Sequence, residues 1–140
     1  MQTDRDIVDS LAGLSLFADL SRPELEAVAH SVDEEWFPEG QRILRQGFAG
    51  NNLYVILEGE AAIHVGGTPR ARLTRGDFFG EVSILLGEPP TADVVASTAL
   101  RCAVVSGTEI RPFLIAHPQV MYRVLQAEAR RLATTLEWLD

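Results

Sequence analysis

Residues 76–96 read Gly-Asp-Phe-Phe-Gly-Glu-Val-Ser-Ile-Leu-Leu-Gly-Glu-Pro-Pro-Thr-Ala-Asp-Val-Val-Ala, and this stretch decides the fold. Gly80 is expected to open a short turn of helix over 81–86, between two strands. The first backbone N–H groups of such a turn have no partner within the helix, so an anion can sit there. Glu81 is a carboxylate able to accept hydrogen bonds from a sugar hydroxyl. Taken alone, a Gly-Glu pair more often marks only a capped, solvated turn.

Short runs with strand character lie on both sides of this stretch. They cover residues 42–45, 53–57, 61–65, 70–74, 93–97 and 100–105. Glycine turns separate them, and a Pro…Gly turn at Trp36–Gly40 precedes the first run. Short strands between glycine turns are typical of a sandwich or barrel. The middle of the chain is therefore predicted to form a β-roll.

Apolar residues have helical spacing at both ends of the chain. Before the strands, Ser21-Arg-Pro-Glu24 predicts a capping box with proline in the first helical turn. After them, a short helix is expected to end at His117-Pro118, and a longer helix to run from about Gln119 to Leu139. Helices, short strands and helices in this order predict an α+β fold.

We predict one domain over residues 1–140, built from three parts. Residues 1–31 form a helical entry, residues 32–106 the β-roll, and residues 107–140 the C-terminal helices. A chain of this length is one domain's worth, since domains most often have about 100–150 residues.

The long C-terminal helix carries an apolar stripe with coiled-coil-like spacing. Its members are Met121, Leu125, Ala129, Leu132, Leu136 and Leu139. Such a stripe either packs on the helix's own barrel or forms the seam of a dimer, and the sequence leaves both interpretations open. The dimer interpretation predicts a homodimer through residues 119–139.

The charge distribution argues against direct nucleic-acid binding. Twelve arginines and no lysine stand against 20 acidic residues, which gives a net charge of −8. Nucleic-acid binding depends on clustered cations that neutralise phosphates. The excess of acid lies within residues 1–40, where a solvated helical face is the expected explanation.

Further features bear on location and class. No apolar run approaches the roughly 18 residues of a membrane span, and residues 1–10 are acidic where a secretory signal would be basic. The lone Cys102 cannot form an intrachain disulfide. These features predict a cytoplasmic protein. His30, His64 and His117 lack metal-ligand spacing, and no catalytic motif appears, so we expect a binding module rather than an enzyme, with no metal or cofactor.

With its flanks, the opening stretch closely resembles the phosphate-binding cassette of the cyclic nucleotide-binding domain family, found in catabolite-activator-type regulators and protein kinase A regulatory subunits. Leu16–Ser21, Phe37–Gly40 and Leu53–Gly59 are similar to the family's entry helix, first turn and central hairpin. The resemblance implies a double-stranded jelly-roll barrel with N-terminal helices, two C-terminal helices and a cassette at 78–92. Because the sequence ends at Asp140, where the family's transcription factors continue into a helix-turn-helix, no DNA contact is expected.

The resemblance also implies a ligand site, with cyclic AMP or cyclic GMP as the possible ligand. By that resemblance Gly80 and Glu81 would hold the ribose, the glutamate through the 2′-hydroxyl. Backbone groups of Val82 and Ser83 would face the cyclic phosphate. In the bacterial regulators a threonine of the long helix contacts the purine, and Thr135 stands at the similar position. An exposed or helix-bonded threonine is an equally good interpretation of that residue.

The second half of the cassette departs from the family pattern. The family has proline, arginine, a small or hydroxyl residue and alanine, whereas this chain has Pro89, Pro90, Thr91 and Ala92. Pro90 therefore replaces the arginine that pairs with the cyclic phosphate. A charge-assisted hydrogen bond is worth roughly 1.5–3 kcal/mol, so the affinity for a cyclic nucleotide should fall by about one to two decades. Strand parity is expected to turn the arginines of 70–72 outward, away from the site.

Two functions follow from these residues. The first is a regulatory sensor for a small ligand that resembles a cyclic nucleotide-binding domain of weakened affinity. The second is a degenerate domain that binds no nucleotide and acts in dimerisation or protein interaction. Glu81 favours the first and Pro90 the second. A small ligand without a phosphate would fit both residues.

Overall fold

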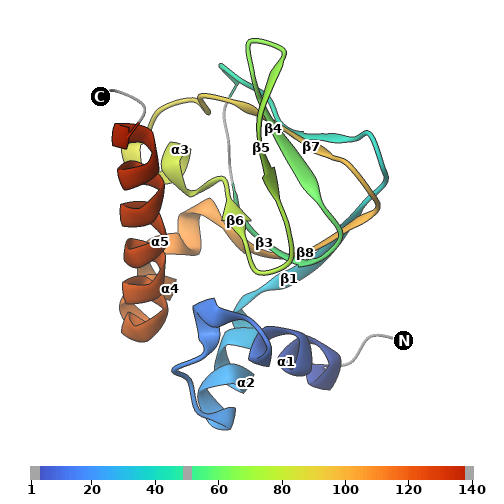
Figure 1. Ribbon diagram of the computed structural model, residues 1–140. Coiled ribbons are helices and arrows are strands. Elements are labelled where there is room, and N and C mark those ends of the chain that lie inside the picture. Colours follow the sequence, from blue (N-terminus) through green and yellow to red (C-terminus); the bar gives the residue numbers. More distant parts are fainter. Residues whose placement is uncertain (1–3, 49–51, 138–140) are drawn as a thin grey trace.

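The computed structural model describes residues 4–48 and 52–137. The chain begins with α1 (Asp4–Ala12), the 3-10 turn η1 (Ser15–Phe17) and α2 (Arg22–Ser31), which lie together below the β-roll (Figure 1). The predicted capping box is confirmed: Ser21 Oγ accepts the N–H of Glu24 at 3.3 Å, and Glu24 Oε1 accepts the N–H of Ser21 at 2.9 Å.

Eight strands follow: β1 (Asp33–Phe37), β2 (Arg42–Leu44), β3 (Asn52–Glu58), β4 (Ala61–Val65), β5 (Thr68–Leu73), β6 (Phe78–Phe79), β7 (Asp93–Ala96) and β8 (Leu100–Ser106). They form two four-stranded sheets with the orders β1-β8-β3-β6 and β2-β7-β4-β5. All neighbouring strands are antiparallel. The predicted β-roll is thereby confirmed.

Two strands were not expected. β1 reads Asp-Glu-Glu-Trp-Phe, and only Phe37 in it is buried, so its sequence lacks the alternation that marks a strand. Pairing with β8, from Asp33 opposite Val104 to Phe37 opposite Leu100, is what extends it. β6 is only two residues long and pairs with β3 at the start of the cassette.

The core has two layers, and the strand alternation of β3 builds both. Leu53, Val55 and Leu57 turn toward the helices. There they join an apolar cluster with residues of the two N-terminal and the two C-terminal α-helices. Tyr54 and Ile56 point the other way, into the space between the two sheets. One sheet is therefore buried on both faces, which explains why β3 and β8 are almost continuously apolar.

Helices complete the fold. The cassette helix α3 (Glu81–Leu86) has the predicted bounds. After β8 come η2 (Gly107–Glu109), α4 (Ile110–Ala116) and α5 (Pro118–Glu137). In Figure 1, α5 runs along one side of the molecule with α3 next to its C-terminal half.

The orientation of α5 decides between the two interpretations of its stripe. Val120 and Val124 are buried in the apolar cluster between the terminal helices and the roll. Met121, Leu125 and Leu132 are 42%, 63% and 59% exposed. The interpretation that the stripe packs on its own barrel is therefore wrong for these residues, because the helix turns a different face inward. The last stripe positions, the Leu136 side chain and all of Leu139, lie outside the part that the structure describes.

A buried arginine joins the N-terminal helices to the roll. Arg101 of β8 is 4% exposed and donates from Nε to Glu34 Oε2 at 2.7 Å. Its Nη1 lies 3.1 Å from both Glu58 Oε1 and Ser10 Oγ. One guanidinium thus connects β8, β1, β3 and α1.

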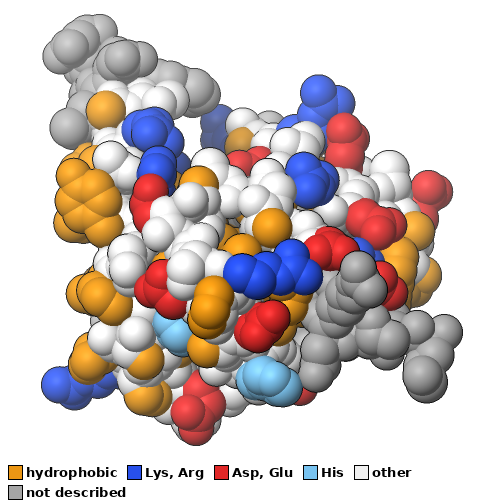
Figure 2. Space-filling view, turned by 90° about the horizontal axis from the view of Figure 1, so that it is seen from below, with side chains coloured by type: hydrophobic (Ala, Val, Ile, Leu, Met, Phe, Trp, Pro, Cys, Tyr) orange, Lys and Arg blue, Asp and Glu red, His pale blue; other side chains and the backbone are white. Residues whose placement is uncertain are grey.

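Charged side chains of both signs are mixed on the described part of the face that is seen from below. Figure 2 shows acidic, basic and apolar side chains interspersed there. Within the described residues, no helix combines the length and the apolar character needed to cross a membrane.

Candidate functional site

A cavity of about 150 Å³ lies where β6, α3, the loop before β7 and α5 meet. It contains seven of the eight residues predicted for the ligand site. The lining residues are Leu44, Ile63, Phe78, Phe79, Gly80, Glu81, Val82, Ser83, Pro90, Thr91, Ala92, Val94 and Arg131. The cassette residues therefore surround one space, although they are separated in sequence by the turn after α3.

Gly80 fixes the entry into α3. Its φ of +95° lies in the left-handed region that favours glycine. A Cβ at this position would also collide with the backbone oxygen of Asn52. Both constraints exclude any other residue without a backbone shift, and they bring the first turn of α3 against β3.

Glu81 is a buried carboxyl whose two oxygens have different surroundings. The residue is 3% exposed, and its Oε1 accepts from Arg131 Nη1 at 2.9 Å. Its Oε2 is buried with no hydrogen-bond partner among the described residues. Burial and the neighbouring Glu128 raise the pKa of Glu81 to about 8, although Arg131 acts in the opposite direction. A donor-bearing ligand would satisfy the free oxygen.

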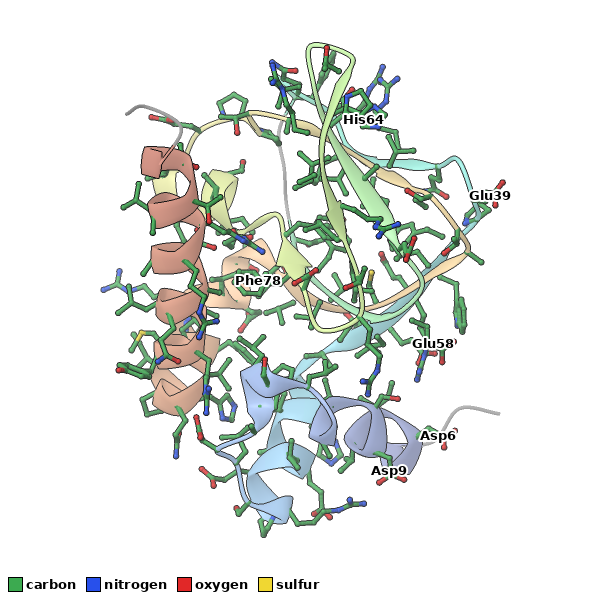
Figure 3. The ribbon with its side chains drawn as sticks, in the orientation of Figure 1. Asp6, Asp9, Glu39, Glu58, His64 and Phe78 are labelled. Carbon is green, nitrogen blue, oxygen red and sulfur yellow. The ribbon has the colours of Figure 1, made fainter. Side chains whose placement is uncertain are left out.

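Arg131 also lines the cavity, and the sequence analysis did not predict it. Besides Glu81 it contacts Glu128 Oε1 at 2.9 Å, and its Nη2 donates to the carbonyl of Phe78 at 2.7 Å. Its guanidinium lies 4.4 Å from the centre of the Phe78 ring. Figure 3 shows Phe78 on the strand that faces α5. A signal was present, since residue 131 continues the inward spacing of Val120 and Val124.

Hydrogen bonds within the loop stabilise the turn after Glu81. Ser83 is buried, and its hydroxyl donates to the carbonyl of Glu88. Gly87, at φ +68°, ends the helix, and its N–H donates to the carbonyl of Ser83. The Ser83 hydroxyl is thus engaged within the loop, while Val82 is 40% exposed at the rim.

Pro90 occupies the wall where the family pattern has an arginine. It is buried, and its carbonyl accepts the N–H of Gly47 at 2.9 Å. Of the described lining residues, Arg131 alone is basic. Arg70 and Arg72 are exposed on β5, as predicted, and Arg72 Nη1 lies 3.8 Å from Glu60 Oε2. Ala71 between them is exposed too, so strand alternation is not what keeps them out of the cavity.

Thr135 is the one predicted site residue that does not line the cavity. Its hydroxyl donates to the carbonyl of Arg131, one helical turn back, at 3.0 Å. The side chain is therefore engaged by its own helix, which is the alternative that the sequence left open. Contact with a purine stays a prediction for this residue.

The other candidate residues lie apart from the cavity. Figure 3 shows His64 near the tip of the β4–β5 hairpin, far from Phe78. The ring of His117 packs against Phe113 at 5.0 Å between centres. Cys102 is fully buried, which raises the pKa of its thiol to about 12. Within the described chain, no group of three side chains is arranged to hold a metal ion.

The comparisons with known proteins point to one family. A family model described as cyclic nucleotide-binding domain matches residues 34–117. The cGMP-dependent protein kinase of Toxoplasma gondii is 30% identical over 128 residues, which are 91% of this chain and 13% of the kinase. Across three curated relatives, two such kinases and a cAMP-dependent kinase regulatory subunit, the chain spans 13–21% of their lengths.

Two solved structures have the same arrangement of elements. The catabolite activator protein of Thermus thermophilus matches with a TM-score of 0.80 and 28% identity, over 89% of this chain and 61% of that one. The regulatory subunit of a cAMP-independent protein kinase A from Trypanosoma brucei matches with a TM-score of 0.75 and 25% identity, over 88% and 47% of the two chains.

Proposed function

Because the chain belongs to the cyclic nucleotide-binding domain family, we propose that it acts as a regulatory sensor whose ligand is held through a ribose at Gly80 and Glu81. Cyclic nucleotides bind this sensor weakly, since Pro90 supplies no cation for the phosphate. The domain has no catalytic role of its own. It changes the state of whatever it is attached to or assembled with.

The observation that carries this proposal is the buried Oε2 of Glu81, which has no partner among the described residues. An unsatisfied buried acceptor costs roughly 1–3 kcal/mol, so a fold keeps one where something else satisfies it. Gly80, whose positive φ sets the entry into α3, places this carboxyl at the cavity wall. Hydroxyl groups of a ribose are donors of the required kind.

Isothermal titration of the chain with cyclic AMP and cyclic GMP tests the proposal. In a titration above pH 8, where the Glu81 carboxyl is ionised, Glu81→Gln should abolish the heat of binding, because it replaces half of the acceptor pair with an amide donor. Glu88→Gln is the matched control, since Glu88 is exposed in the same loop and only its backbone contacts Ser83. Binding that is indifferent to Glu81→Gln would refute the proposed site.

A homodimer through α5 is the second part of the proposal. Its support is the exposed ridge of Met121, Leu125 and Leu132, because contiguous exposed apolar side chains mark interfaces. A twofold pair with the two α5 helices side by side closes this surface. Sedimentation should give a dimer for the native chain and a monomer for Leu125→Glu/Leu132→Glu. Thr134→Glu, an exposed residue outside the stripe, is the control. A native monomer at tens of micromolar would refute the dimer.

The alternative function is an interaction module without a nucleotide, and Pro90 is what favours it. The Trypanosoma relative, described as part of a cAMP-independent kinase, is a case in which this fold is not tied to cyclic AMP. Absence of any titration heat together with an intact dimer would select this alternative. We place either function in the cytoplasm, on the support of the unpaired, buried Cys102.

A further inference from the structure

We infer that the cavity beside Glu81 selects an uncharged ligand with a vicinal diol, a ribonucleoside, over the cyclic monophosphate of the same base. The inference rests on the proposed function, because it names the ligand class of the same site. Three observations carry it: the charges around the cavity, the chemistry of its remaining wall, and the hydrogen-bonding capacity left on Glu81.

The charged side chains around the cavity leave no free cation for a phosphate. Glu81 and Arg131 are the two charged side chains in the described lining. Arg131 is bound to Glu81 and Glu128, both at 2.9 Å, and to the carbonyl of Phe78. With Glu81 protonated, Glu128 already cancels the charge of Arg131; with Glu81 ionised, the three groups sum to −1. In neither state does the cavity present an unneutralised cation.

Most of the remaining wall is hydrocarbon. It is lined by Leu44, Ile63, Pro90, Ala92 and Val94, with Thr91 as the hydroxyl-bearing residue among them. A phosphate pressed against this wall loses its water and gains at most the Thr91 hydroxyl, since proline has no N–H and the aliphatic side chains carry no donor. An uncharged hydroxymethyl group loses far less on the same transfer. The wall therefore discriminates by charge rather than by size.

The free oxygen of Glu81 favours a ligand with two hydroxyl donors. In a 3′,5′-cyclic monophosphate the 3′-oxygen is esterified, so the ribose offers only its 2′-hydroxyl. A nucleoside offers the 2′- and 3′-hydroxyls side by side. The ionised carboxyl accepts from both at once, and the protonated carboxyl accepts from one and donates its proton to the oxygen of the other. Among the described residues, Oε2 has no hydrogen-bond partner, and Oε1 accepts from Arg131. The acceptor capacity thus exceeds what a cyclic nucleotide can use.

The cavity suits a sugar in size. Its volume of about 150 Å³ is that of a cavity able to take up a molecule of about the size of benzene, and a ribose ring is of similar size. A sugar ring fills such a space, and the base extends past the exposed Val82 at the rim.

Titration calorimetry of the native chain with adenosine, guanosine, cytidine and uridine, and with cyclic AMP and cyclic GMP, tests the inference. A purine ribonucleoside should bind with a dissociation constant at least about tenfold below that of its own cyclic monophosphate. This is the lower end of the loss expected for a missing charge-assisted contact. Removing either the 2′- or the 3′-hydroxyl should weaken nucleoside binding about tenfold, and Glu88→Gln should leave it unchanged.

The outcomes distinguish a failure of this inference from a failure of the sensor proposal. A cyclic nucleotide that binds as tightly as its nucleoside, or a 3′-deoxynucleoside that binds as well as the parent, overturns the inference but leaves the sensor proposal standing. If neither class gives heat with the native chain, while circular dichroism shows it folded, the inference and the sensor proposal both fail. Binding that survives Glu81→Gln places the ligand elsewhere and also overturns the inference.

Discussion

Replacing Pro90 by arginine would return a cation to the wall of the cavity at the position where the family pattern has one. The side chain at 90 is buried and lines the cavity, so a guanidinium there points into the space that a phosphate would occupy. The bond between the carbonyl of residue 90 and the N–H of Gly47 uses only the backbone, and the substitution preserves it. The loop should therefore keep its path.

The size of the effect follows from the new contact. A charge-assisted hydrogen bond contributes roughly 1.5–3 kcal/mol, which corresponds to about a ten- to hundredfold gain in affinity for cyclic AMP or cyclic GMP. Replacing a proline that fits the folded backbone raises the conformational entropy of the unfolded chain, which lowers stability by about 0.4–1 kcal/mol. The melting temperature should fall slightly even as cyclic nucleotide affinity rises.

Titration calorimetry of Pro90→Arg beside Pro89→Arg measures this effect. Pro89 is exposed and does not line the cavity, so its substitution adds the same charge one residue away without placing it near the ligand. An equal gain in both variants would mean that long-range charge alone is responsible. No gain in a folded Pro90→Arg chain would refute the argument that the missing cation limits cyclic nucleotide binding.

Three further predictions concern the polar contacts of the fold. Arg131→Met should lower the free energy of unfolding by about 1–3 kcal/mol, measured in urea, because it leaves the buried carboxyl of Glu81 without its donor. The matched control is Arg130→Met, since Arg130 is exposed and should tolerate the change. Arg101→Met should cost about 3 kcal/mol, since it strands the half-buried Glu34; a loss below about 1 kcal/mol would contradict a structural role. The pKa of Glu81 is about 8 in the folded chain, above its ordinary value of 4.5. The contribution of this carboxyl to stability is therefore full below about pH 4.5 and is lost as the pH rises through 8. Glu81→Gln should therefore flatten the decline of stability between pH 5 and 8.5, and an unchanged pH profile would show that this carboxyl is already ionised.

The sequence predicted those parts of the fold that local chemistry determines. Gly80, the helix that ends before Gly87, and the capping box at Ser21 were all found, because each depends on neighbours within a few residues. β1 was missed, since its acidic run has no alternation and is a strand only by pairing with β8. Propensity cannot reveal a strand that its partner imposes.

The site was predicted less completely than the fold, for a geometric reason. Seven residues carried over from the cassette do surround one cavity. Arg131 is not in the cassette, and its role depends on which face of α5 turns toward the roll. That orientation is visible from the sequence only once Val120 and Val124 are known to point inward. The same ambiguity left the apolar stripe with two interpretations until its exposure was seen.

The two faces of α5 give the proposals a common consequence. Arg131, on the inner face, holds the carboxyl that the ligand would contact, and Leu125 and Leu132, on the outer face, would form the dimer seam. A ligand that draws Glu81 away from Arg131 weakens the contact that joins this half of α5 to α3, and leaves Arg131 with its bond to the Phe78 carbonyl of β6. Coupling between two sites is reciprocal, so a ligand that changes dimer affinity must have its own affinity changed equally by the dimer. Ligand affinity that does not vary between dilute monomer and concentrated dimer would therefore mean that α5 only positions Arg131 and transmits nothing.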